Sequence, residues 1–236
     1  KTGSVKRVIV TGCLAQRMGE GLKKEAPGID AIVGLAERDR IAQIIKSAMS
    51  EQGKETAIYV GGDQSTVSDD TGRLLITPRH WAYLRISEGC DRKCAFCTIP
   101  AIRGRFRSKP ADKVIAEANE LVSNGARELS IIAQDSNYYG RDRGEKNGLV
   151  NLLKRLEQIE GLDWIRLMYL YPAGVDSELI ETIAQSPKIV NYVDIPVQHI
   201  NDEILKSMRR ADRKEKTIEL INRLRTAMPD VVLRTT

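Results

Sequence analysis

Short apolar runs alternate with amphipathic stretches over the first sixty residues of the chain. Residues 5–12 (VKRVIVTG) and 28–34 (GIDAIVG) are rich in the β-branched apolar residues typical of buried strands. Residues 14–26 (LAQRMGEGLKKEA) and 37–49 (ERDRIAQIIKSAM) instead carry apolar residues at helical spacing. This alternation predicts part of an open α/β sheet, and we assign residues 1–60 to one domain.

The composition changes after this domain. Residues 61–72 (GGDQSTVSDDTG) are dominated by Gly, Ser, Thr and Asp, and they offer little apolar surface to bury. Such a stretch is typical of a connection between domains. We therefore expect a linker over residues 61–78.

From residue 79 to residue 236, strand-like and helical stretches alternate again. The predicted strands are residues 81–89 (WAYLRISEG), 127–135 (RELSIIAQD), 164–172 (WIRLMYLYP), 189–199 (IVNYVDIPVQH) and 231–236 (VVLRTT). The predicted helices are residues 110–125, 148–161, 176–186, 201–210 and 214–228. Repeated βα units predict parallel strands with the helices outside. We expect a TIM-like (β/α) barrel that is incomplete at the C-terminus; the alternative is a doubly wound open sheet.

Three of the four cysteines fall within the segment SEGCDRKCAFCTIP, residues 87–100, where Cys90, Cys94 and Cys97 have the spacing C-x3-C-x2-C. Structural zinc requires four ligands, and the nearest further candidate, His80, lies across a predicted strand. A disulfide would leave one thiol over. Three thiolates on a four-iron cluster leave one iron open for another ligand. The spacing therefore favours a [4Fe–4S] cluster.

The neighbours of these cysteines are basic. Arg92 and Lys93 lie between the first two cysteines, and a basic neighbour favours the thiolate over the thiol. Residues 79–109 hold eight basic and two acidic residues, whereas the whole chain has a net charge of +5. This window is either a solvated face or a surface that attracts an anionic substrate or an RNA-rich partner.

Composition narrows the class of protein further. The chain is 42% hydrophobic and 29% charged, which is an ordinary globular mixture. It contains no run of 18 apolar residues, so we expect no membrane contact. It opens with no signal segment, and its clustered cysteines do not form a secreted disulfide framework. These features predict a cytoplasmic protein.

A resemblance to a known family adds to this interpretation. The C-x3-C-x2-C motif, with Phe96 before its last cysteine and a strand before its first, resembles the signature of radical S-adenosylmethionine (SAM) enzymes. The resemblance implies that SAM chelates the open iron and is cleaved to methionine and a 5′-deoxyadenosyl radical. It also implies that Phe96 lies beside the adenine of SAM.

The resemblance extends over nearly the whole chain. Residues 8–17 (VIVTGCLAQR) resemble the end of the N-terminal domain of methylthiotransferases, and residues 88–108 (EGCDRKCAFCTIPAIRGRFRS) resemble their radical-SAM core. It implies that Cys13 is the third ligand of a second, auxiliary [4Fe–4S] cluster, which carries the sulfur that is inserted. The first two ligands of that cluster have no counterpart here, and the late barrel and the TRAM domain would lie beyond Thr236. We expect this chain alone to transfer no methylthio group.

Three loops favour one branch of this family. The segments AQDSNYYG, YLYP and PVQHIN resemble the RimO branch and differ from those of the MiaB-like tRNA branch. The resemblance implies a transferase that adds a methylthio group to the β-carbon of an aspartate in small-subunit ribosomal protein S-twelve, free or within the ribosome. It also implies an electron donor such as flavodoxin or ferredoxin. The alternatives are a tRNA adenosine methylthiotransferase and a non-enzymatic metal- or cluster-binding module.

Polar residues at the ends of the predicted strands are further candidates for the site. Barrel enzymes carry their chemistry at the carboxyl ends of the strands. Gln134, Asp135 and Gln198 occupy such positions, and we expect them to contact SAM. His199 is expected to cap or hydrogen-bond near the site, and His80 to lie on the surface.

For other residues around the site, the sequence leaves more than one role open. One of Arg103, Arg105 and Arg107 is expected to pair with the SAM carboxylate or to orient the acidic substrate. Tyr138 and Tyr139 either line the substrate mouth or pack a βα loop. We place residues 203–210 and 220–228 on the barrel exterior rather than interpreting them as partner-binding helices.

Overall fold

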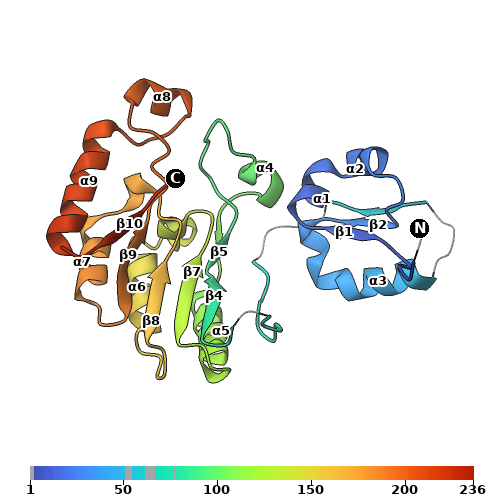
Figure 1. Ribbon diagram of the computed structural model, residues 1–236, viewed down its shortest axis with the longest axis horizontal. Coiled ribbons are helices and arrows are strands. Elements are labelled where there is room, and N and C mark those ends of the chain that lie inside the picture. The colour runs from blue at the N-terminus through green and yellow to red at the C-terminus, as the bar shows by residue number, and fades with distance from the viewer. Residues whose placement is uncertain (1–2, 51–54, 62–66, 77) are drawn as a thin grey trace. The chain divides into compact units, whose positions relative to one another are not determined.

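The computed structural model describes residues 3–50, 55–61, 67–76 and 78–236. These residues form two compact units, which are treated separately below. One unit comprises Lys1–Ser68 with Thr98–Gly104, and the other comprises Asp69–Cys97 with Arg105–Thr236. Each unit is built on a parallel sheet (Figure 1). The predicted α/β fold class is therefore confirmed.

The first unit has a three-stranded parallel sheet of order β1-β2-β3. The strands are β1 (Ile9–Thr11), β2 (Ala31–Val33) and β3 (Ala57–Tyr59). Its helices are α1 (Cys13–Met18), α2 (Glu20–Glu25), α3 (Ile41–Ser50) and α4 (Ile99–Arg103), with the 3₁₀ turns of η1 (Leu35–Arg40) before α3. The single predicted helix over residues 14–26 is two helices, because Gly19 has φ 49 at the break. The elements β3 and α4 were not predicted from the sequence.

The two faces of β2 pack against different helices. Ile32 lies in one apolar cluster with Ala15 of α1 and Leu22 of α2. Ala31 and Val33 point the other way, and they pack with Ile44 of α3 in a second cluster. Successive side chains of a strand point to opposite faces, so this short central strand is buried on both sides.

The second unit has a five-stranded parallel sheet of order β10-β9-β8-β7-β4. The strands are β4 (Trp81–Arg85), β7 (Glu128–Ile132), β8 (Trp164–Leu167), β9 (Ile189–Asp194) and β10 (Val232–Arg234). In Figure 1 the colour runs across this sheet from green at β4 to red at β10, so neighbours in the sheet are also successive along the chain. This order is that of a barrel wall.

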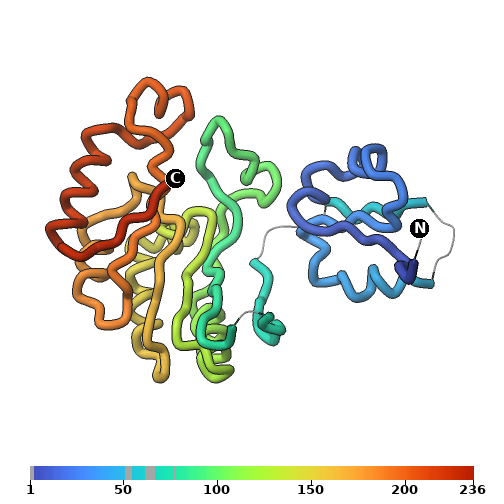
Figure 2. The backbone as a smooth tube through the Cα atoms, viewed as in Figure 1, coloured from blue at the N-terminus to red at the C-terminus, as the bar shows by residue number. Residues whose placement is uncertain are grey.

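Helices connect the strands of this sheet and pack on it. They are α5 (Ala111–Ser123), α6 (Gly148–Leu156), α7 (Ser177–Gln185), α8 (Asp202–Ser207) and α9 (Lys214–Ala227). Shorter elements are the antiparallel pair β5 (Ser87–Glu88) and β6 (Arg107–Ser108), and the 3₁₀ turns η2 (Ser136–Tyr138), η3 (Arg141–Arg143) and η4 (Pro172–Gly174). The tube in Figure 2 traces each strand and the return of the chain through the helix that follows. None of the helices in the described ranges combines the length and apolarity needed to cross a membrane.

A single large apolar core lies between the sheet and the helices of the second unit. Leu129 and Ile131 of β7 and Leu152, Leu153 and Leu156 of α6 are fully buried in it. Burying one such side chain contributes about 1.5–3 kcal/mol. This core fixes the strands, and so it fixes the positions at which their carboxyl ends present side chains.

The predicted linker lies only partly within the described residues, since residues 62–66 and 77 fall outside them. From Asp69 to Cys97 the chain belongs to the second unit. Asp70 pairs with Arg85 of β4 at 2.8 Å, and Arg73 pairs with Glu117 of α5 at 3.0 Å. Charged side chains thus attach this part of the predicted linker to the second unit.

Candidate functional site

The cysteine loop, residues 89–97, follows β5 near the carboxyl end of β4. Cys90 is buried, Cys94 is half-buried and Cys97 is exposed. The amide of Cys97 donates to the carbonyl of Cys94 at 3.1 Å, which closes a tight turn between these two thiols. Among the described residues, no three His, Cys, Asp or Glu side chains gather as ligands of one metal ion.

Three contacts hold this loop against the rest of the second unit. The Phe106 amide donates to Asp91 Oδ1 at 3.0 Å, and Arg92 Nε donates to Asp135 Oδ2 at 2.7 Å. The Ala95 amide donates to the carbonyl of Met208 at 2.9 Å. The loop is therefore tied next to β6, to the end of β7 and to the end of α8.

The thiol of Cys90 holds its proton more strongly than its basic neighbours alone would suggest. Burial raises the pKa of the Cys90 thiol to about 11, although the backbone amide and the charge of Arg92 act in the opposite direction. That amide lies 3.4 Å from Cys90 Sγ. Arg92 thus favours the thiolate, as predicted, but desolvation by burial has the larger effect on this thiol. A metal ion that binds Cys90 would have to displace the proton of its thiol.

Gln134 and Asp135 follow β7, as predicted, and present buried acceptors beside the loop. Asp135 is 2% exposed, and burial raises the pKa of its carboxyl against the influence of Arg92. Asp135 Oδ1 and Gln134 Oε1 are both buried, and neither has a hydrogen-bond partner within the described part of the chain. Leaving such an atom unpaired costs about 1–3 kcal/mol. Two acceptors of this kind side by side in sequence fit a ligand that brings hydrogen-bond donors.

A stack of side chains that the sequence analysis missed stands next to these acceptors. The Arg92 guanidinium carbon lies 3.9 Å from the centroid of the Tyr171 ring, and that of Arg210 lies 4.2 Å from the same centroid. Arg210 Nη2 lies 2.8 Å from Asp212 Oδ2, and it also donates to the carbonyl of Pro196 at 2.7 Å. Arg210 ends the stretch 203–210 that was placed on the barrel exterior, but its side chain is buried and so is not part of a solvated face. The burial of Arg210 could not be predicted from hydrophobic periodicity, because a buried arginine depends on partners that only the fold brings to it.

The basic window is only partly a surface. Arg85 pairs with Asp70, Arg92 with Asp135, and Lys109 with Glu117, and these basic side chains are 12%, 28% and 2% exposed. These cations, one buried and two half-buried, offset carboxylates within the second unit. The idea of a solvated or partner-attracting face is therefore wrong for these three of the eight basic residues in the window.

Two other predicted contacts with SAM lie at different places. Phe96 is on the cysteine loop, and 53% of its surface is exposed. Gln198 has φ 68, its amide donates to the carbonyl of Thr236 at 2.8 Å, and its side chain lies 3.5 Å from the Thr236 hydroxyl. Both assignments stay predictions.

Tyr138 and Tyr139, which were expected either to line the substrate mouth or to pack a βα loop, have different surroundings. Tyr139 is fully buried, and its hydroxyl donates to the carbonyl of Lys109 at 2.7 Å, so Tyr139 packs the βα loop. Tyr138 is half-buried and meets Phe106 edge-on at 5.0 Å beside Arg92. Tyr138 therefore borders the cysteine loop.

The two histidines have peripheral places. His80 is exposed, as predicted. His199 Nδ1 accepts a hydrogen bond from the amide of Asn201 at 2.9 Å, and Asn201 in turn caps α8. His199 therefore supports a turn, which agrees with the expected capping role.

The three arginines after the cysteine loop go to different partners. In the first unit, Arg103 Nη2 lies 3.1 Å from Cys13 Sγ, at the first residue of α1. Arg105 is almost fully exposed and lies 3.6 Å from Asp91, and Arg107 donates to the carbonyl of Arg105 at 2.7 Å. The expected pairing of one of them with a SAM carboxylate stays a prediction, as does the role of Cys13 as a cluster ligand.

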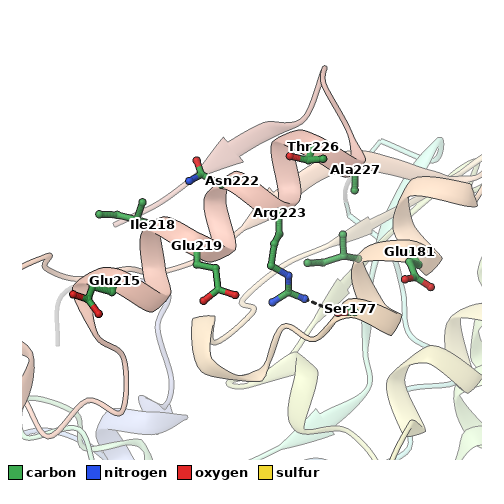
Figure 3. Close-up of a pocket in the computed structure, with 10 residues that line it drawn as sticks. Ser177, Glu181, Glu215, Ile218, Glu219, Asn222, Arg223, Thr226 and Ala227 are labelled. Carbon is green, nitrogen blue, oxygen red and sulfur yellow. Dashed lines mark hydrogen bonds between the residues drawn. The ribbon is translucent and has the colours of Figure 1, made fainter.

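A groove on the helical side of the second unit lies away from these residues. Its volume is about 640 Å³, and it runs between α7 and α9. Figure 3 shows Arg223 reaching toward Ser177, with a hydrogen bond of 2.9 Å, and the carboxylates of Glu181, Glu215 and Glu219 around them. The cysteine loop contributes no residue to this lining. We therefore place the candidate site at the thiols of the cysteine loop and the buried acceptors of Gln134 and Asp135, and not at this groove.

A comparison with known families decides the class of the second unit. The family model described as "Radical SAM superfamily" matches residues 84–236, which include the cysteine loop and the sheet from β7 to β10. The chain belongs to the radical SAM superfamily. This membership confirms the family resemblance of the C-x3-C-x2-C motif.

Curated relatives resemble the chain over its whole length. "Ribosomal protein uS12 methylthiotransferase RimO" of Geobacter sulfurreducens is 45% identical over 233 residues, 99% of this chain and 52% of the relative. The protein of the same name from Thermoanaerobacter sp. is 45% identical over 237 residues, 100% of this chain and 53% of the relative. The chain thus spans about half the length of the curated relatives that it matches.

Solved radical SAM enzymes share the fold. OxsB, a cobalamin-dependent SAM radical enzyme solved with aqua-cobalamin and SAM, matches with a TM-score of 0.66 and 14% identity over 96% of this chain and 35% of its own. TsrM from Kitasatospora setae, a radical SAM methyltransferase, matches with a TM-score of 0.53 and 18% identity over 66% of this chain and 30% of its own. At these identities the likeness concerns the fold alone, and it confirms the TIM-like radical-SAM core.

Proposed function

We propose that this chain is part of a methylthiotransferase that modifies the β-carbon of an aspartate in small-subunit ribosomal protein uS12. The observation that carries this proposal is the 45% identity, over 99% of the chain, to a protein named for that activity. Because the chain spans 52% of that relative, the activity is proposed for the whole protein. The cysteine loop supports it, since it supplies the donors that radical SAM chemistry requires.

The residues at this loop fit an iron–sulfur cluster and SAM. We assign Cys90, Cys94 and Cys97 as the ligands of a [4Fe–4S] cluster, which leaves one iron for the cofactor. When bound, this cluster supplies the electron that cleaves SAM to methionine and a 5′-deoxyadenosyl radical. Gln134 Oε1 and Asp135 Oδ1, for which the described residues offer no hydrogen-bond partner, are suited to the amino group or the ribose hydroxyls of SAM.

Other proposed contacts complete the SAM site. We assign Phe96 to the adenine because its exposed ring lies on the cysteine loop itself. Gln198 is assigned as a further contact from the segment that follows β9. Cys13 is proposed as one ligand of an auxiliary [4Fe–4S] cluster in the whole protein.

The proposed reaction replaces hydrogen by a methylthio group. A C–H bond at the aspartate β-carbon breaks, and its hydrogen is transferred to give 5′-deoxyadenosine. A C–S bond to a methylated sulfur forms in its place; this sulfur would leave the auxiliary cluster that carries it, and the one electron released would pass to that cluster. A second SAM supplies the methyl group. A flavodoxin or ferredoxin would supply electrons, and a cytoplasmic location would bring the enzyme to uS12, free or within the ribosome.

Mass spectrometry of uS12 and of tRNA tests this proposal. The full-length gene is expressed in cells lacking their own enzyme of this activity, with the Cys94→Ala variant as the control. We expect uS12 to gain the mass of one methylthio group in place of a hydrogen, and the control to leave it unmodified. A gain on a tRNA adenosine, with uS12 unmodified, would assign the chain to the sister tRNA enzymes.

Anaerobic reconstitution with iron and sulfide tests the non-enzymatic alternative. We expect a brown protein that forms 5′-deoxyadenosine from SAM when dithionite is added, and the Cys94→Ala variant should lose both properties. Stoichiometric zinc on the three cysteines, without iron uptake, would instead support a structural metal-binding module.

A further inference from the structure

We propose that Arg92 is a positioning residue, which together with Asp135 fixes the cysteine loop and sets the reduction potential of the cluster it holds. This inference rests on the proposed function, because it takes Cys90, Cys94 and Cys97 as cluster ligands. It assigns a role to an ion pair that is not itself a ligand.

Arg92 is held on its edge and on its face. It follows Cys90 by two residues and precedes Cys94 by two. Its Nε donates to Asp135 Oδ2 at 2.7 Å, and its guanidinium carbon lies 3.9 Å from the centroid of the Tyr171 ring. A planar cation with a carboxylate at its edge and an aromatic ring on its face has a single favoured orientation. Arg92 therefore ties the middle of the loop to the ends of β7 and β8.

The aromatic ring against which Arg92 lies is itself immobilised. The hydroxyl of Tyr171 accepts a hydrogen bond from the amide of Ala211 at 3.2 Å, and Arg210 lies 4.2 Å from the same ring. Arg210 is buried and pairs with Asp212 at 2.8 Å. The support behind Arg92 thus consists of paired, buried groups, which favours a fixed cation over a mobile one.

Arg92 is anchored next to the first cysteine through its backbone, and its partner Asp135 is buried. The amide of Arg92 is 3.4 Å from Cys90 Sγ, and the side chain of Asp135 is 2% exposed. Reduction adds one electron to the cluster, so a nearby cation favours the reduced form and a nearby anion opposes it. The two members of the pair must therefore act in opposite directions on the potential.

This opposition separates an electrostatic role from a merely structural one. If Arg92 and Asp135 only kept the loop in place, removing either one would loosen the same contact. Both variants would then change the cluster in the same way. If their charges act, neutralising Arg92 lowers the potential, whereas neutralising Asp135 raises it.

The test uses the 236-residue chain, reconstituted anaerobically and titrated without SAM, with the reduced cluster followed by electron paramagnetic resonance. Arg92→Gln should lower the ratio of reduced to oxidised cluster at a fixed potential by about tenfold, which equals about 59 mV for one electron. Asp135→Asn should raise this ratio. Arg92→Lys keeps the charge but loses the planar fork, and it should lie between Arg92→Gln and wild type.

Lys93→Gln is the matched control, since it removes the same charge from the same loop at an exposed side chain. We expect it to keep the wild-type potential, because water and salt screen an exposed charge. Equal shifts for Arg92→Gln and Lys93→Gln would overturn the inference, as would shifts of Arg92→Gln and Asp135→Asn in the same direction. Should Arg92→Gln hold no cluster, an unchanged potential in Asp135→Asn would overturn it.

The same experiment distinguishes a failure of the proposed function from a failure of this inference. Iron and sulfide are measured first in the wild-type chain. A wild type that takes up no cluster would contradict the proposed function and this inference together. A wild type that holds the cluster and cleaves SAM, with variants that show no opposite shifts, would contradict this inference alone.

Discussion

Lys109 Nζ lies 2.6 Å from Glu117 Oε2, and only 2% of each side chain is exposed. The same ammonium reaches Asp70 Oδ2 at 3.0 Å, and Asp70 also pairs with Arg85, which contacts Glu88. This network joins the segment before β4 to α5 and to the strand residues directly before the cysteine loop. It is a second buried ionic cluster, distinct from the Arg92 stack.

Removing the cation from this network should destabilise the second unit strongly. Lys109→Met leaves Glu117 with the more exposed Arg73 as its cationic partner, and breaking a buried pair costs roughly 3–5 kcal/mol. Both tryptophans, Trp81 and Trp164, lie in the second unit, so urea unfolding followed by tryptophan fluorescence measures this change. Lys113→Met is the control, because the Lys113–Asp69 pair is exposed and should contribute at most about 1 kcal/mol. Equal losses in the two variants would contradict this account.

Asp70 should give this stability a dependence on pH. Burial opposes ionisation, but hydrogen bonds and charges from Arg85 and Lys109 outweigh it and lower the pKa of the Asp70 carboxyl. A carboxyl with a lowered folded-state pKa stabilises the fold above its unfolded pKa of about 3.9, and this contribution is lost as the pH falls through the folded pKa. Asp70→Asn should therefore lower the free energy of unfolding by about 1–3 kcal/mol at neutral pH, and the difference should shrink in acid.

The measurement for Asp70 is urea unfolding of both proteins at a series of pH values. Asp112→Asn is the control, since the Asp112 side chain is 91% exposed in its pair with Arg155. It should change the free energy little at any pH. A wild-type advantage over Asp70→Asn that stays constant into strong acid would argue against the network.

The start of α6 requires glycine for a steric reason. A Cβ at Gly148 would lie 2.6 Å from the carbonyl oxygen of Tyr139 and 2.8 Å from the Cα of Gly140. Neither backbone atom can move without disturbing the loop after β7, so Gly148→Ala should cost about 1–3 kcal/mol in urea unfolding. Asn151→Ala, at an exposed position of the same helix, should leave stability unchanged or slightly higher. If Asn151→Ala destabilised the protein and Gly148→Ala did not, the steric reason would be contradicted.

The cysteines should separate into two groups when iron uptake is measured. After anaerobic reconstitution of this chain, alanine at Cys90, Cys94 or Cys97 should remove most of the bound iron and sulfide, because each replaces a proposed ligand. Cys13→Ala should keep the cluster, since Cys13 lies in the first unit and is assigned to a different centre. Comparable iron loss in Cys13→Ala would mean that the ligand set has been assigned wrongly.

The periodic parts of the fold could be predicted from local sequence. The apolar runs at residues 81–89 and 127–135 contain β4 and β7, and residues 110–125 contain α5. The end of a strand and the position of a cysteine motif are also local properties, so the loop was expected at the carboxyl end of β4. The strand β3 was not predicted, although β1 and β2, which were, are equally short.

The partners of buried charges could not be predicted in this way. Arg92 and Asp135 are 43 residues apart, and Arg92 reaches Tyr171 from still farther along the chain. In sequence, Lys109 belongs to a basic window and Arg210 to an exposed helical stretch, yet both side chains are buried. Only the fold shows that carboxylates lie against them.

The sequence by itself determined that this is an α/β chain of βα units with three thiols in one loop, because strand and helix periods and ligand spacing depend on residues close together along the chain. The tertiary structure alone decided which charges are internal, which acceptors beside the loop lack a partner, and how strongly Cys90 holds its proton. Those properties depend on desolvation and on the distance between charges, and folding sets both by bringing remote residues together.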